Sequence, residues 1–162
     1  MSTTATKKAP AAILVTPALA KRILDEGYGP GAWHGNDMKA ALADVTPKLA
    51  YWRPAPGRHN IAEIAIHHAF YQHSVRGRLT GAKLEPFVLE GDDWFVIDDE
   101  KAMAWKKIVD VVESMQKKLA AIAGDGSILP EDERLGLLIG ITCHAVYHAG
   151  QIQLLKKLHA GV

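Results

Sequence analysis

The chain has 162 residues, with 19 Lys and Arg against 18 Asp and Glu, eight His and one Cys. A formal net charge of +1 argues against a non-specific nucleic-acid binder, a single Cys cannot form an internal disulfide, and no run of about 18 apolar residues predicts a membrane-spanning helix. We therefore expect one cytoplasmic domain over residues 13–162, with no nucleic-acid or membrane partner, behind a disordered leader over residues 1–12.

The first predicted helix is short. Thr16 is a good N-cap and Pro17 suits the first helical position, because proline lacks only a backbone N–H that would have no helical partner there. Gly27 and the Gly29-Pro30-Gly31 cluster should end this helix.

A second short helix is predicted after this turn. Asn36 or Asp37 can cap it, and it should run through Ala43. The segment that follows reads as a rigid connector within the domain, because it is rich in turn residues, namely Pro47, Pro54, Pro56 and Gly57.

A long helix is predicted from Asn60 to about Leu79. Asn60 and Glu63 lie three residues apart, as in a capping box, and Thr80-Gly81 should end the helix. Residues 82–99 show neither helical nor strand periodicity. We expect an ordered loop that packs its aromatic side chains onto the helices, namely Phe87, Trp94 and Phe95.

Two long helices complete the predicted set, one from about Glu100 to Ala123 and one from Pro130 to about His159. The first is amphipathic, with a four-residue repeat of Met103, Lys107, Val111, Met115 and Leu119. Gly124-Asp125-Gly126 should end it, and acidic residues then occupy the first turn of the last helix, where the dipole favours them. Since no run alternates as a strand does, the sequence predicts an all-α protein.

Two histidines lie in the middle of the core stripe of the last helix. This stripe comprises Leu137, Ile141, His144, His148, Gln151, Leu155 and Leu158. His144 and His148 are one helical turn apart, so their rings can converge on one metal ion. A pair of ordinary core histidines, each satisfied by hydrogen bonds, explains this spacing about as well. We expect the adjacent Cys143 to be a small buried hydrophobe.

A third ligand would have to come from His67 or His68, in the middle of the helix predicted from residue 60. Periodicity favours His68, because the apolar stripe of that helix is centred near it. A di-iron site is excluded, since the chain has no pair of Glu-x-x-His motifs. The residues alone therefore leave the third ligand open.

Several motifs together resemble the DinB-like (DinB/YfiT) metalloenzymes over residues 17–158. They are Trp33-His34-Gly35, Trp52-Arg53-Pro54, the run from His59 through His67 and Ala69 to Gly81, Trp94, Trp105, and His144-x-x-x-His148-x-Gly150-Gln151. The resemblance implies an up-down-down-up four-helix bundle that forms a homodimer. It also implies a divalent metal ion, such as Zn, Ni or Fe, held by His67, His144 and His148.

An ion with three protein ligands keeps a fourth position open, as catalytic sites do. The resemblance implies a metal-dependent transferase that acts on a small molecule with a low-molecular-weight thiol, or alternatively a metal-dependent hydrolase. A non-catalytic bundle that is stabilised by metal or senses it is the competing interpretation, and three ordinary core histidines without metal is another. Catalytic residues are not assigned. Glu63 could orient His67 or only cap its helix, and Gln151 and His34 could lie near the pocket.

Overall fold

The computed structural model describes residues 14–124 and 129–161. These residues form α-helices and no strand, as the sequence predicts. The predicted leader over residues 1–12 lies outside the described residues, as do Asp125 and Gly126. Six helices are present within the described ranges: α1 (Pro17–Tyr28), α2 (Met38–Leu42), α3 (Pro47–Ala50), α4 (Ile61–Thr80), α5 (Trp105–Ile122) and α6 (Glu131–Ala160).

Side-chain caps start three of these helices where the sequence predicts them. The Thr16 hydroxyl accepts a hydrogen bond from the third residue of α1, and the Asp37 carboxylate, rather than Asn36, does the same for α2. Asn60 Oδ1 accepts from the Glu63 N–H at 2.8 Å and begins α4. Gly81 ends α4 in the left-handed conformation that glycine adopts without strain.

Three details differ from the sequence prediction. The connector contains one helical turn, α3, because Thr46 caps it and Pro47 occupies its first position. Helix α5 begins at Trp105 rather than near residue 100, because the Asp99 carboxylate accepts from two backbone N–H groups of the following residues and holds them in a turn. Lys107, expected in the apolar stripe of this helix, is exposed.

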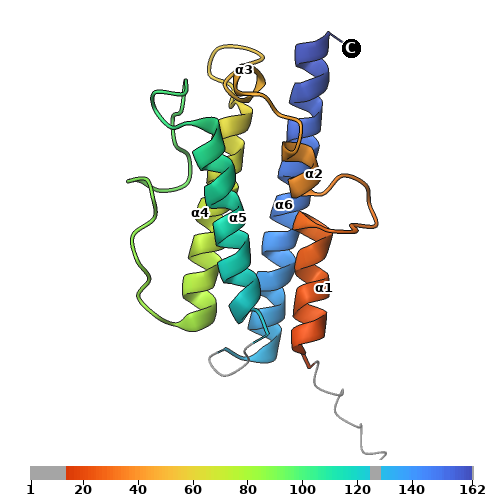
Figure 1. Ribbon diagram of the computed structural model, residues 1–162. Coiled ribbons are helices and arrows are strands. Elements are labelled where there is room, and N and C mark those ends of the chain that lie inside the picture. The colour runs from red at the N-terminus through yellow and green to blue at the C-terminus, as the bar shows by residue number, and fades with distance from the viewer. Residues whose placement is uncertain (1–13, 125–128, 162) are drawn as a thin grey trace, which may run out of the picture.

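The four long helices lie alongside one another (Figure 1). Helix α4 packs against α5 and α6, while α1 packs against α6 and α5, and α2 also covers α6. The chain runs upward in Figure 1 through α1 and α6 and downward through α4 and α5. The loop between α4 and α5 returns the chain to the upper end, and its aromatic residues pack on the core as expected, namely Phe87, Trp94 and Phe95.

Helix α6 packs against α1, α2 and α4, yet the described residues leave one of its faces uncovered. Cys143 and Leu158 are exposed, contrary to the sequence expectation, and His159 near the end of the helix is half-buried. Within the described residues α6 alone is long and apolar enough to cross a membrane, by length and composition only. This is weak evidence for a membrane, because the core helix of a bundle passes the same test.

Candidate metal centre

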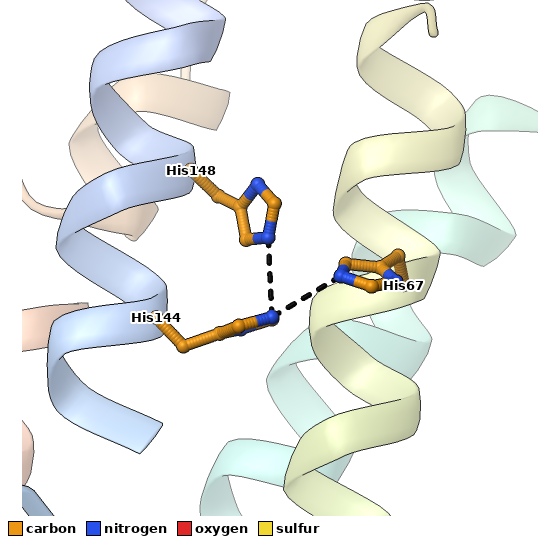
Figure 2. A group of neighbouring side chains, drawn as sticks. All are labelled: His67, His144 and His148. Carbon is orange, nitrogen blue, oxygen red and sulfur yellow. Dashed lines mark hydrogen bonds between the residues drawn. The ribbon is translucent and has the colours of Figure 1, made fainter. Parts of the chain in front are cut away.

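Three histidines from two helices meet where α4 packs against α6 (Figure 2). His144 and His148 come from successive turns of α6, and His67 faces them from α4. The Nε2 atom of His144 lies 3.1 Å from Nε2 of His67 and 3.1 Å from Nε2 of His148. His67 is 5% exposed and His148 is 2% exposed, whereas His144 is half-buried. The structure thus brings together the three residues that the family resemblance implies.

In two of these histidines the outer ring nitrogen, which is the Nδ1 atom that faces away from the cluster, donates a hydrogen bond. His67 Nδ1–H donates to the backbone carbonyl of Asp93 at 2.8 Å, and His148 Nδ1–H donates to Gln151 Oε1 at 2.6 Å. A carbonyl oxygen only accepts, so each ring carries its proton on Nδ1 and turns a lone pair on Nε2 toward the cluster. Such partners fix the tautomer and the orientation of metal-binding histidines.

The neighbouring His68 does not belong to the cluster, although apolar periodicity favours it. His68 Nδ1 instead lies 3.0 Å from Nδ1 of His144, on the outer side of that ring. His68 is fully buried, and its Nε2 has no hydrogen-bond partner among the described residues. Gln72 Oε1, one turn further along α4, is also buried without a partner. His68 is therefore the partner that the outer nitrogen of His144 contacts.

Burial keeps the clustered imidazoles neutral. Burial, helped by the neighbouring histidines, lowers the pKa of His144 to about 3 and that of His148 to about 4. Burial also lowers the pKa of His67, despite the opposing hydrogen bond to Asp93. At neutral pH all three rings are therefore uncharged, which is the form that binds a metal ion.

The arrangement of these nitrogens fits a cation. Two lone pairs, from His67 and His148, point at Nε2 of His144, and one N–H there can satisfy only one of them well. Two nitrogens bound tetrahedrally to one ion at about 2.0–2.1 Å would lie about 3.3–3.4 Å apart. The observed separations of 3.1 Å are close to this value.

The loop before α5 supplies two further residues at the site. Asp93, which gives its carbonyl to His67, has a φ of 66°, a left-handed conformation that is uncommon outside glycine. The indole of Trp94 stacks between two imidazole rings. Its centroid lies 3.7 Å from the ring centroid of His59 and 3.8 Å from the ring centroid of His67. The sequence predicts only that both residues lie in an ordered loop. It does not predict that they reach the histidines, because the contact of this loop with α4 depends on the fold.

The hydrogen bonds of the Glu63 carboxylate do not include His67. The carboxylate instead accepts hydrogen bonds from the Arg53 guanidinium, from His59 Nδ1 at 2.9 Å and from the Ile97 N–H at 3.1 Å. Glu63 thus joins the connector, the start of α4 and the loop around Ile97. Its hydrogen bonds hold segments that surround the site in place, and they do not orient the candidate ligand His67.

The remaining histidines have contacts outside the cluster. The ring of His34 donates to the backbone carbonyl of Glu26 at 2.6 Å, and His73 and His159 are half-buried elsewhere. Gln151, in contrast, lies at the site, since it both accepts from His148 and donates to the Tyr147 hydroxyl.

Comparison with known protein families found a match over most of the chain. A sequence model described as the DinB superfamily matches residues 32–152, which include His67, His144 and His148. No curated protein and no solved structure matches the chain.

Proposed function

The chain belongs to the DinB superfamily, and from this membership we propose that His67, His144 and His148 bind one divalent metal ion. The observation that carries the proposal is the convergence of one ring nitrogen from each histidine within 4.8 Å of one another. Buried, neutral rings with acceptors on their outer nitrogens support it further. Imidazole ligands suit Zn, Ni and Fe, and ion availability decides among them as much as affinity does.

We further propose that the protein is a transferase that uses a low-molecular-weight thiol. When bound, the ion supplies a positive charge that lowers the pKa of a substrate thiol and leaves a reactive thiolate. The three neutral imidazoles leave that positive charge undiminished. Cys143 is exposed and does not line the cavity beside His148, so the thiol would arrive with the substrate.

Three finer features belong to the same proposal. Helices α1, α4, α5 and α6 would form the up-down-down-up four-helix bundle that the family resemblance implies, in line with their course in Figure 1. The protein would act as a homodimer. It would reside in the cytoplasm, since its single cysteine requires no oxidising compartment.

Elemental analysis tests the metal site directly. Protein purified without chelator should contain about one divalent ion per chain, and His148→Ala should contain less than about 0.1 because two histidines hold an ion too weakly. His34→Ala is the matched control, because His34 lies outside the cluster and should leave the metal content unchanged. Wild-type protein with less than about 0.1 ion per chain, even after incubation with Zn²⁺, would overturn the proposal.

The reaction needs its own assay. Metal-loaded protein mixed with cysteine or glutathione and an aryl halide should form the thioether, and chelator should abolish the reaction. Chelator-sensitive cleavage of esters or amides without thioether formation would replace the transferase by the hydrolase alternative. Metal binding with neither activity would identify a non-catalytic bundle that is stabilised by metal or senses it.

A further inference from the structure

A cavity of about 440 Å³ opens beside the three-histidine cluster. Its inner wall includes His148, and it lies between the connector before α4 and the C-terminal half of α6, with Trp94 on a third side. This volume falls in the range of small-molecule sites, about 300–1,000 Å³. Because His148 belongs to both the cavity and the cluster, a molecule bound here lies against the proposed metal centre.

The cavity is lined mainly by apolar side chains from α6. Leu154 is 57% exposed and Leu158 is 48% exposed, and Tyr147 beside them is also exposed. Leucine side chains on a core helix ordinarily pack against protein, so this much apolar surface in one hollow favours an apolar ligand.

The only cation with a fixed charge on the cavity wall is Arg58, and no Asp or Glu lines the cavity among the described residues. The nearby Arg53 is neutralised by Glu63 and Asp98. Arg58, in contrast, is exposed and makes no ion pair within the described part of the chain. The mouth of an apolar cavity therefore carries one unneutralised guanidinium, which is a natural partner for a carboxylate.

We propose that this cavity binds small amphiphilic anions, with the carboxylate at Arg58 and the apolar body against Leu154, Leu158 and Tyr147. The inference rests on the proposed function in one respect, since it names the substrate class of the same site. The end of the ligand away from Arg58 would extend toward His148, where the proposed chemistry takes place.

Three probes with one apolar body test the proposal: 4-phenylbutanoate, the uncharged 4-phenylbutanamide and the cationic 4-phenylbutylamine. Calorimetric titration of the chelator-treated full chain should show binding of the carboxylate at least about tenfold tighter than binding of the amide, and weakest binding of the amine. Equal affinity for the three probes, or no binding of any of them, would overturn the inference.

Substitutions locate the contacts. Arg58→Gln should remove the preference for the carboxylate and leave the affinity for the amide unchanged, and Arg58→Glu should reverse the preference toward the amine. Leu154→Ser should weaken binding of all three probes. The controls are Arg78→Gln and Val88→Ser, an exposed arginine and an exposed apolar residue that do not line this cavity, and both should bind as wild type does.

The same titrations separate this inference from the proposed function. A preference for the carboxylate that persists without metal and depends on Arg58 supports the anion site even if metal analysis fails. A preference that appears only in Zn²⁺-loaded protein and is insensitive to Arg58→Gln places the carboxylate on the ion. That result would overturn the anion site and leave the metal proposal intact.

Discussion

Each of the three clustered histidines has a contact on its outer nitrogen, and for His144 that contact is another histidine. When Nε2 of His144 binds the metal ion, the ring carries its proton on Nδ1, which lies 3.0 Å from Nδ1 of His68 and can donate to it. His68 must then carry its own proton on Nε2, the buried atom that has no partner among the described residues. His68 therefore orients the candidate ligand His144, while its own Nε2–H stays without a hydrogen-bond partner among the described residues.

This arrangement predicts that a change at His68 weakens metal binding without a comparable loss of stability. His68→Leu removes the partner of His144 and should weaken Zn²⁺ binding about 10–100-fold. It also removes Nε2, a buried ring nitrogen that has no partner among the described residues, so the free energy of unfolding of the metal-free protein should change by less than about 1 kcal/mol. Competition titration with a chromophoric chelator measures the first quantity, and urea denaturation measures the second.

His68→Gln provides the matched comparison. Its amide oxygen can accept from His144 Nδ1–H, so this variant should recover part of the affinity that His68→Leu loses. If the two variants bind Zn²⁺ as tightly as wild type, His68 does not orient His144, and its burial is a matter of packing alone.

The start of α4 fixes the loop that surrounds the site. Asn60 Nδ2 donates to the Ile97 carbonyl at 2.8 Å, and Glu63 accepts from the Ile97 N–H at 3.1 Å, so two side chains of one helical turn hold both polar groups of one loop residue. This anchor lies three residues beyond Trp94, whose indole packs on His67. The cap of α4 thus also determines where the loop meets a candidate ligand.

The Glu63 carboxylate should give the protein part of its stability in a pH-dependent way. Burial alone raises the pKa of Glu63, but hydrogen bonds from Arg53, His59 and Ile97 outweigh burial and lower it below the ordinary value. Its contribution is therefore complete above the unfolded pKa of about 4.3 and is lost as the pH falls through the lower folded pKa.

Glu63→Gln tests this dependence. At pH 7 it should lower the free energy of unfolding by about 3 kcal/mol, because Arg53 loses its buried anionic partner. The difference from wild type should shrink below about pH 4. Denaturant titrations from pH 3 to 7 measure it, with the exposed Glu90→Gln as control. Parallel curves for wild type and Glu63→Gln at all pH values would contradict the argument.

The sequence predicts the elements well where the signal is local. Thr16, Asp37 and Asn60 are caps that act within three residues, and the structure has all three. The choice between His67 and His68 is different in kind, because it depends on how α4 is rotated against α6. Residues 61–69 of α4 are all buried, so no exposed face of this segment marks the direction of the cluster. Only the family resemblance identified His67.

Side-chain exposure on α6 is the other feature that the sequence predicts poorly, because free cysteines are usually buried and Leu158 continues the apolar stripe. Cys143 was expected to be buried and Leu158 to face the core, but both are exposed. An apolar residue on a long helix indicates that other apolar groups should pack against it. It does not indicate whether those groups belong to the same chain. Contacts between distant segments, such as that of Asp93 with His67, leave no periodic signal at all.

At the scale of the whole molecule, the uncovered face of α6 bears on the proposed homodimer. Ile139, Cys143 and Tyr147 recur every four residues and are all exposed, so they form one apolar stripe along the helix. Gly136 and Gly140 lie on the same half of α6, and a side chain built at either would meet open space. Small and apolar residues along one helix face allow a second helix to approach closely, and a twofold contact would pair this stripe with its own copy.

Sedimentation equilibrium at micromolar concentration tests the dimer. We expect a mass near twice the chain mass of 17.6 kDa. Ile139→Glu should shift it to that of one chain, because each interface would bury two unpaired carboxylates. Ile139 is exposed, so the monomer should keep its helical circular dichroism. Val96→Glu, at an exposed loop position, should stay dimeric. A wild-type mass of 17.6 kDa would exclude the dimer at that concentration, and a dimeric Ile139→Glu would place the interface elsewhere.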